Sequence, residues 1–379
     1  MKKTVALLTL IISLGLLPGA QAANESIDLS LEATPSAGTL FKEVHRPVDA
    51  SLTVTVSNPP SEPTIMPLKV ANVTFPRDMD FFPNEEKTPA CPASKLNDQS
   101  NLAAGVAATV ALCPNSVVGT GTAVVQIAQN KGSEPIPTVT DPRLVIFNAG
   151  RNKQGRPKIV IYGYSKIVQA GLLMHGTLAN NGELRIEIGV MPYDSSVSKF
   201  TLGIPGEPLV VDESPGTEKS TVQGLDPQYL RGKCSTGVWR ATGSFVLGTR
   251  THPGGQPISD DFFVDSNPFE LPCKGAVGKA KLKIGKIVGP KTAKAGRKAS
   301  FLVKVKNAGT ATAKSLRLTA SGAAKGTAVP GSLAPGGSRK VRIAVRPSAR
   351  GKQTLVRFVA RASGVTAASS SRKITIRKG

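Results

Sequence analysis

The C-terminal part of the chain alternates apolar and basic side chains and lacks acidic ones. Residues 274–379 contain 26 Lys and Arg and no Asp or Glu. The runs Phe301 to Lys306, Val341 to Arg346 and Val356 to Arg361 each place an apolar residue at every second position. A period of two predicts strands with apolar side chains inside and basic side chains outside. About six or seven such strands, separated by Gly and Pro turns, predict an immunoglobulin-like β-sandwich over residues 274–379.

Charge is divided unequally along the chain. The net charge is +23 overall, so the acid-free part carries +26 and the part before it −3. This asymmetry indicates an anionic polymer as partner, bound through outward basic residues in adjacent rows on a sheet surface. The alternative is a basic surface that only keeps the domain soluble. Phe301 and Phe358 are the only aromatic residues of this part and are expected to point inward, so no ring is left to stack on nucleic acid bases. Binding would then be through charge, without sequence-specific nucleic acid recognition. The residues expected to bind the polymer are Lys304, Lys306, Arg317, Lys340, Arg342, Arg357 and Arg361.

Two segments of the C-terminal part carry a family resemblance. One is Val305-Lys306-Asn307-Ala308-Gly309-Thr310, after Ala295-Gly296 and the strand at Phe301, and the other is the segment from Ser332 to Ser338 before Val341. Over roughly Ile284 to Arg377 the chain resembles the cell-adhesion-related (CARDB-type) domains of bacterial surface proteins. The resemblance implies an immunoglobulin-like fold and a place at the cell surface. Those domains often carry acidic residues, whereas this one has none.

Residues 23–273 also show the signs of an all-β fold. Short apolar runs such as Leu52–Val56 and Ile159–Tyr164 recur between Gly- and Pro-rich stretches. Leu172–Leu178 and Leu184–Val190 flank Asn-Asn-Gly and predict a β-hairpin. We expect a β-sandwich over 23–273, held by disulfides, either as one unit or as two lobes separated near residues 131–142. One short helix is expected within residues 101–111, which are rich in Ala.

The first 22 residues have the features of a signal peptide. Lys2 and Lys3 precede an apolar stretch from Val5 to Leu17, and Ala20-Gln21-Ala22 matches a cleavage site. The alternative is a retained helical anchor, for which this stretch is short. No Cys follows the stretch, so a lipoprotein anchor is not expected. The sequence predicts export to the cell envelope or the extracellular space, without a transmembrane anchor.

The four cysteines are an even number, as expected in an oxidising compartment. Three pairings are possible, and we favour Cys91–Cys113 with Cys234–Cys273, because each pair then closes a local loop. The alternative roles are a metal site or a redox pair. No C-x-x-C motif occurs and no Cys lies near a His, so we expect neither a metal nor a cofactor.

Few residues predict catalysis. The three histidines, at 45, 175 and 252, are scattered, and His175 is expected to be a half-buried strand residue. Gly163-Tyr164-Ser165-Lys166 lacks the second Gly of a nucleophile elbow, and Gly119 and Gly121 are expected to form a bulge or turn. The remaining alternatives are a calcium loop formed by Asp260, Asp261, Asp265 and Asn267, and a glycosidase carboxylate pair including Glu85 and Glu86.

The front part carries a second resemblance. Its features are the run from Cys113 to Ala123, and Cys234 and Cys273 bracketing Gly237-Val238-Trp239. These features resemble uncharacterised secreted proteins of high-GC Gram-positive bacteria, which implies architecture and compartment but no activity. The sequence therefore favours a non-enzymatic secreted or envelope-associated protein whose basic tail contacts anionic wall or matrix polymers. The alternative is an extracellular glycan-acting hydrolase that uses the tail for targeting. The sequence does not indicate the oligomeric state.

Overall fold

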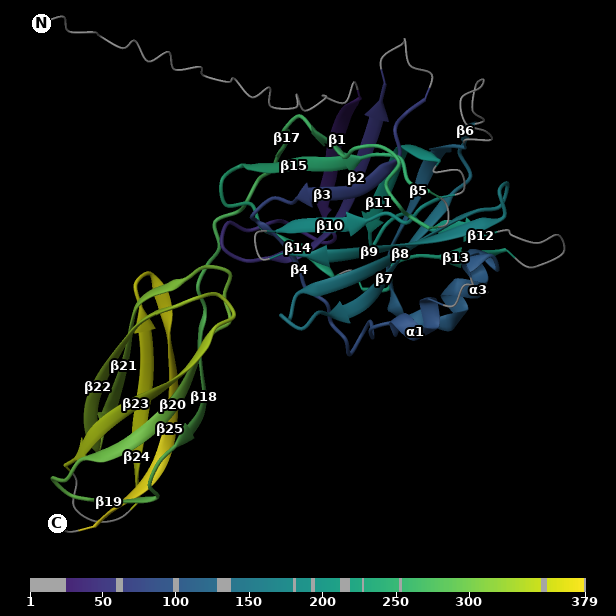
Figure 1. Ribbon diagram of the computed structural model, residues 1–379. Coiled ribbons are helices and arrows are strands. Elements are labelled where there is room, and N and C mark those ends of the chain that lie inside the picture. The colour runs from purple at the N-terminus through teal and green to yellow at the C-terminus, as the bar shows by residue number, and fades with distance from the viewer. Residues whose placement is uncertain are drawn as a thin grey trace, which may run out of the picture.

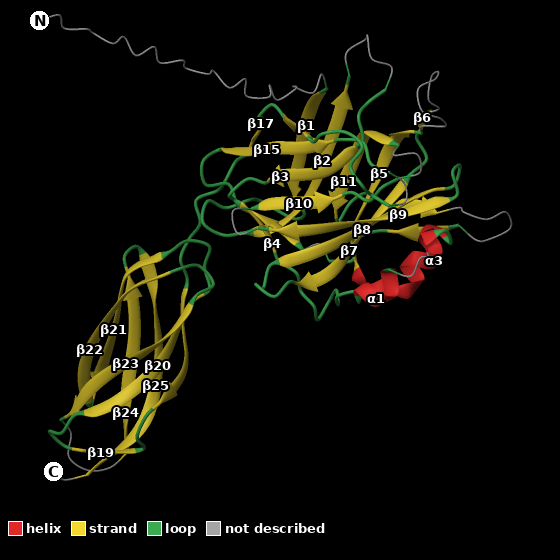
Figure 2. Cartoon of the chain, viewed as in Figure 1, coloured by secondary structure: helices red, strands yellow, loops and turns green. Residues whose placement is uncertain are grey.

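The computed structural model is built almost entirely of β-strands, with helices in one short stretch (Figure 2). It describes residues 25–58, 64–97, 102–127, 138–179, 182–191, 195–211, 219–226, 228–251, 254–348 and 353–377. The expected signal peptide, His252 and residues 131–137 therefore lie outside the described residues. We call residues 25–273 the front region and the following part the C-terminal domain.

The front region contains seventeen of the strands. Its main sheet follows the order β16-β15-β3-β10-β9-β8-β7-β5-β11-β2-β14-β4, with β1, β17 and β6 paired at its sides, and β12 with β13 forms a separate ribbon. The bounds are β1 Ser26–Pro35, β2 Arg46–Ser57, β3 Leu68–Thr74, β4 Met79–Phe81, β5 Val117–Gln126, β6 Thr138–Val139, β7 Arg143–Arg151, β8 Pro157–Ser165, β9 Ala170–Leu178, β10 Glu183–Glu187, β11 Ser196–Ile204, β12 Leu209–Val211, β13 Ser220–Val222, β14 Leu230–Gly232, β15 Val238–Leu247, β16 Phe262–Asp265 and β17 Phe269–Pro272.

The sheet interleaves segments that are distant in sequence. Strand β3 lies between β10 and β15, and β2 lies between β1 and β11, all antiparallel. Strands from before and after residues 131–142 thus share one ladder. Each strand alternates as the sequence predicts: in β2, Leu52, Val54 and Val56 are buried while Thr53 and Thr55 are less so. The expected hairpin is present as β9 and β10, with Gly182 at a positive φ in its turn.

Strands β7 and β8 are buried on both faces. One face, including Leu144 and Ile161, belongs to the main core, whereas the other, including Val145 and Tyr162, packs beneath the helices. The helices are α1 Ala93–Leu96, α3 Gly105–Leu112 and the 3₁₀ turn η1 Pro114–Ser116. The disulfide Cys91–Cys113 belongs to this second cluster and joins the two ends of the helical segment. Figure 1 shows this segment beside β7 and β8. The short helix predicted around residues 101–111 is therefore confirmed.

Gly119 and Gly121 lie inside β5 where β11 approaches closely. A Cβ atom at these positions would lie 2.2 Å from the carbonyl oxygen of Gly203 and 2.0 Å from that of Thr201. The pairing of β5 with β7 also shifts register between Val117 and Gly119. The glycines thus form a bulge, as the sequence indicated, and they also allow a close approach of β11 that the sequence did not indicate.

The C-terminal domain forms the predicted immunoglobulin-like sandwich. Its strand order is β18-β20-β23-β22-β21-β24-β25-β19. Phe301 on β20 and Phe358 on β24 are fully buried and meet across the core, with ring centroids 5.4 Å apart. The outward faces of β20 and β24 therefore point in opposite directions. The bounds are β18 Leu282–Val288, β19 Thr292–Lys294, β20 Ala299–Asn307, β21 Ala313–Gly322, β22 Ala324–Leu333, β23 Ser338–Pro347, β24 Gln353–Ala362 and β25 Val365–Arg377.

The two parts meet at one end (Figure 1), where backbone and side-chain hydrogen bonds join them. The backbone of Ala276 bonds to Leu40 and Lys42 of the front region. Thr312 of the C-terminal domain donates to the Glu43 carboxylate from its backbone N–H, at 2.8 Å, and from its hydroxyl, at 2.6 Å. Both hydrogen bonds lower the pKa of Glu43, and the bond from the hydroxyl has the larger effect.

Candidate functional site: the basic faces of the C-terminal domain

Four of the seven predicted binding residues lie on one face of the C-terminal domain. Lys304 and Lys306 on β20, with Lys340 and Arg342 on β23, are exposed, while the residues between them are largely buried. Lys304 pairs directly with Lys340 across the two strands. We call these four residues, together with Lys283, the lysine face.

Lys283 was not among the residues predicted to bind. It is exposed on β18 and pairs directly with Lys306. The alternation of Leu282 and Ile284 with lysines already gave its outward direction. What the sequence could not give is the register that places β18 beside β20.

The other three predicted residues lie on the opposite face. Arg317 on β21 and Arg361 on β24 are exposed and directly paired, and Arg357 is exposed on β24. Lys373 on β25 is exposed on the neighbouring strand. We call these four the arginine face. The expectation of adjacent rows on one sheet surface is therefore wrong, because the strands divide between two halves of a sandwich whose outward faces oppose each other.

Like charges stand directly opposite each other on both faces. Lys283–Lys306, Lys304–Lys340 and Arg317–Arg361 are such pairs, and cross-strand pairs of equal charge destabilise a sheet. Because residues 274–379 contain no Asp or Glu, no carboxylate within this part can offset the repulsion. The result is a surface with a strong positive field, and an external polyanion would relieve its repulsion.

Some basic residues serve the fold instead. Arg372 donates to the backbone oxygens of Ile287 and Gly289, and its guanidinium lies 5.9 Å from the ring centroid of Phe301. Arg339 donates to the carbonyl oxygen of Pro330. Charge alone therefore does not identify a residue as part of a binding surface.

Asn307 organises the loop beside the lysine face. Its side chain is fully buried and forms four hydrogen bonds. The side-chain nitrogen donates to the carbonyl oxygens of Ala311, at 2.8 Å, and Leu333, at 3.0 Å. The side-chain oxygen accepts from the backbone N–H groups of Lys281, at 3.1 Å, and Gly309, at 3.0 Å. The amide therefore joins three segments and explains why the Val305–Thr310 segment forms a fixed loop.

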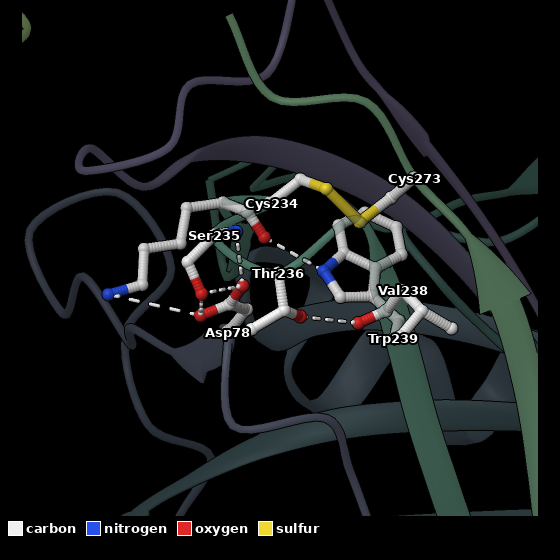
Figure 3. Close-up of a disulfide and its surroundings, with 8 residues drawn as sticks. Asp78, Cys234, Ser235, Thr236, Val238, Trp239 and Cys273 are labelled. Carbon is white, nitrogen blue, oxygen red and sulfur yellow. Dashed lines mark hydrogen bonds and ion pairs between the residues drawn. A yellow bond between two sulfur atoms is a disulfide. The ribbon is translucent and has the colours of Figure 1, made fainter. Parts of the chain in front are cut away.

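The front region is stabilised around its second disulfide, Cys234–Cys273 (Figure 3). The neighbouring Trp239 is buried and donates its indole N–H to the carbonyl oxygen of Lys233 at 2.8 Å. The carboxylate of Asp78 accepts from the backbone N–H and the hydroxyl of Ser235. Both disulfides thus occur in the pairing favoured from the sequence. Cys91–Cys113 joins the two ends of the helical segment between β4 and β5, and Cys234–Cys273 joins the chain after β14 to the chain after β17.

The acidic candidates of the front region do not converge. Asp261 pairs with Lys69, whereas Asp265 is exposed on β16. Within the described ranges, no three His, Cys, Asp or Glu side chains gather as a metal site. Glu85 and Glu86 are exposed in the turn after β4, and they line neither the apolar hollow lined by Leu144 nor the hollow beside His45.

The described histidines lie apart from each other. His45 is half-buried. Its burial lowers the pKa of the imidazole most, and the positive charge of Lys233 lowers it further. His175 is exposed on β9, so its prediction as a half-buried residue is wrong. The reason is its register position: it faces away from Met174, which points into the main core.

The CARDB family model matches residues 279–369. The C-terminal domain is therefore similar to domains of the CARDB type. This match confirms the resemblance seen in the sequence, and the immunoglobulin-like sandwich agrees with it. CARDB domains form a family related to cell adhesion, which is consistent with a binding or structural role.

The other comparisons add little beyond the CARDB match. No curated protein matches the chain. Among solved structures, the crystal structure of red sea bream transglutaminase aligns at 10% identity with a TM-score of 0.23, over 93% of this chain and 31% of that one. Such a score carries no argument about fold or function. Within the described residues, no helix is long and apolar enough to cross a membrane.

Proposed function

We propose that the protein is a non-enzymatic binding protein of the cell envelope or extracellular matrix, which the CARDB domain attaches to anionic polymers. The family relationship to cell adhesion supports a binding role. Export by residues 1–22 belongs to the same proposal. The two disulfides support it, because such bonds persist outside the cytoplasm.

The observation that carries the proposal is the arrangement of charge on the CARDB domain. Neighbouring strands lie about 4.8 Å apart, and alternate residues along one strand lie roughly 6.7 Å apart. The lysine face therefore presents a two-dimensional grid of cations that no internal carboxylate neutralises. A flexible polymer with closely spaced phosphate, sulfate or carboxylate groups can contact several of these cations at once and release its counterions. Recognition of this kind is weakened by salt and depends little on polymer sequence.

The test uses the mature chain with sets of four charges removed. One variant carries Lys→Gln at 304, 306 and 340 with Arg342→Gln, and a second carries Arg→Gln at 317, 357 and 361 with Lys373→Gln. A matched control removes four front-region charges, with Lys→Gln at 87, 153, 158 and 199. Each protein is eluted by a salt gradient from heparin and from purified wall-polymer resin, with neutral dextran as the uncharged matrix.

We expect both CARDB variants to elute at clearly lower salt than the parent protein. The lysine-face variant should change most, because its charges form the denser grid. The front-region control should elute close to the parent protein. Equal shifts for the control and the CARDB variants, or retention that ignores salt, would refute the proposal.

We do not propose the glycan hydrolase. A hydrolytic pair needs two carboxylates across a cleft, about 5–9 Å apart. The apolar hollow lined by Leu144 and Ile161 has no acidic lining residue, and the hollow beside His45 has Asp80 alone.

A further inference from the structure

The front region contains an apolar cavity of about 390 Å³ that is partly open to solvent. Ligand pockets in proteins usually measure about 300–1,000 Å³. Seven neighbouring strands, β3, β10, β9, β8, β7, β5 and β11, contribute to its wall, together with β6 beside β5. The sheet thus curls around this space, as a small barrel does around a single ligand.

The wall of the cavity is almost wholly aliphatic. It includes Val125, Leu144, Ile161, Leu172 and Met174, and no charged side chain lines it. Water in a buried site needs two to four polar partners, and this wall provides few of them. A ligand rich in hydrogen-bonding groups would lose its hydration here without compensation.

Small residues keep the cavity open. Gly163 lines it, and a Cβ atom there would lie 2.9 Å from Leu144 Cδ2 and 3.6 Å from Met174 Cε. Ala123 lines the same space from β5. Protein interiors are close-packed and contain few voids larger than a water molecule. A cavity of this size, lined with flexible methionine and leucine side chains, is therefore suited to an apolar molecule that completes the packing.

One end of the cavity lies at the turn between β8 and β9. Ser165 lines the cavity there, and its hydroxyl donates to Asp141 Oδ1 at 2.8 Å. The next two residues, Lys166 and Ile167, are exposed, with Ile167 at 72%. Val125, Leu172 and Met174 are only partly buried, so the space is not sealed. An amphiphile with its chain against the aliphatic wall would have its polar end at this exposed turn.

We propose that this cavity binds a single long acyl chain. The aliphatic wall, the polar end and the volume all fit such a chain. This function goes beyond the attachment proposed for the CARDB domain and does not depend on it. The chain could belong to a free fatty acid or to a membrane lipid, and two arms of the experiment distinguish these sources.

The experiment uses the delipidated mature protein. In one arm palmitate is titrated against a bound fluorescent fatty acid, and stoichiometry is read by native mass spectrometry. In the other arm, phosphatidylglycerol vesicles with a fluorescent acyl chain report extraction of lipid. We expect one acyl chain per protein in at least one arm. Palmitate binding indicates a free acid as the source, and extraction alone indicates a membrane lipid.

A matched pair of variants tests whether the acyl chain binds inside this cavity. Val125→Trp fills the cavity from β5, whereas Val124→Trp adds the same bulk to the adjacent half-buried valine outside the cavity lining. We expect Val125→Trp to raise the Kd at least about tenfold and Val124→Trp to leave it nearly unchanged. Met174→Gln, with His175→Gln as its control, repeats the comparison without added bulk and covers the case in which a Trp variant fails to fold.

Two results would overturn the proposal. One is no uptake by the parent protein in either arm. The other is an equal loss of binding in a folded cavity variant and its control.

Discussion

The clearest test of the CARDB fold is the removal of the Asn307 amide. Asn307→Ala deletes four hydrogen bonds, of which the bond to Leu333 is fully buried. Each such bond contributes a net ~1 kcal/mol, and a buried group left unpaired loses more. The expected loss in the free energy of unfolding of this domain is therefore about 3–5 kcal/mol. For a domain of this size, such a loss lowers Tm by more than about 12 °C.

The unfolding of the two parts can be distinguished by spectroscopy. Its only Trp, Trp239, lies in the front region, and residues 274–379 contain neither Trp nor Tyr. In urea unfolding of the mature chain, Trp fluorescence thus reports the front region and far-UV circular dichroism reports both parts. Asn307→Ala should move only part of the dichroism transition to lower urea and leave the fluorescence midpoint unchanged.

Asn152→Ala is the matched control for a surface amide. Its oxygen accepts from the backbone N–H groups of Gln154, at 2.9 Å, and Arg156, at 3.0 Å, in a turn that water can reach. We expect a loss of about 1 kcal/mol there. If Asn307→Ala costs no more than this control, or moves the fluorescence midpoint equally, the reasoning about the buried amide is wrong.

Three further changes have defined outcomes. Replacing Cys234 and Cys273 by Ala opens a loop with a sequence separation of 39 and should reduce stability by about 4 kcal/mol in the chain-entropy model, with a red shift of Trp239 emission on partial unfolding. Burial raises the pKa of Tyr229, and the unfolded chain releases this proton above about pH 10, so stability falls as pH rises beyond that value. Tyr229→Phe should flatten this alkaline loss in pH-dependent unfolding and raise the free energy of unfolding at pH 7 by about 1 kcal/mol, because the described structure gives this buried hydroxyl no hydrogen-bond partner. Thr312→Ala removes the main cause of the lowered Glu43 pKa, so the carboxyl should titrate nearer its ordinary value in an NMR pH series, and an unchanged titration would exclude this contact in solution.

The sequence predicted local structure well because alternation depends on neighbouring residues. It gave the outward direction of Lys304 and Lys340 and the inward direction of Phe301 and Phe358. It could not give the division of basic residues between two faces, because that depends on which strands pair. The segment from Val305 to Thr310 attracted attention as a family motif, but only the folded chain explains it, through the contacts of Asn307 with Leu333.

The cavity illustrates the same limit at larger scale. Its wall is assembled from eight strands, which are the seven from β3 to β11 along the sheet and β6 beside β5, and no single one of them differs from an ordinary core strand in its pattern. Gly163 was noted only as part of a failed nucleophile motif. Its missing side chain has a meaning once Leu144 and Met174 are known to be its neighbours. Empty space cannot be predicted from the periodicity of one strand.

The acid-free composition of the CARDB domain also determines how it responds to acid. Residues 274–379 contain no Asp, Glu, His, Tyr or Cys side chain, and Lys and Arg keep their charge below about pH 10. Acid unfolding arises mostly from carboxylates that are protonated as the pH falls, and these residues have none. The cationic surface is therefore the same in an acidified medium as at neutral pH. If acidification releases this domain from an acidic polymer, the release is controlled by protonation of the polymer. The groups that respond to pH then belong to the polymer and not to this domain.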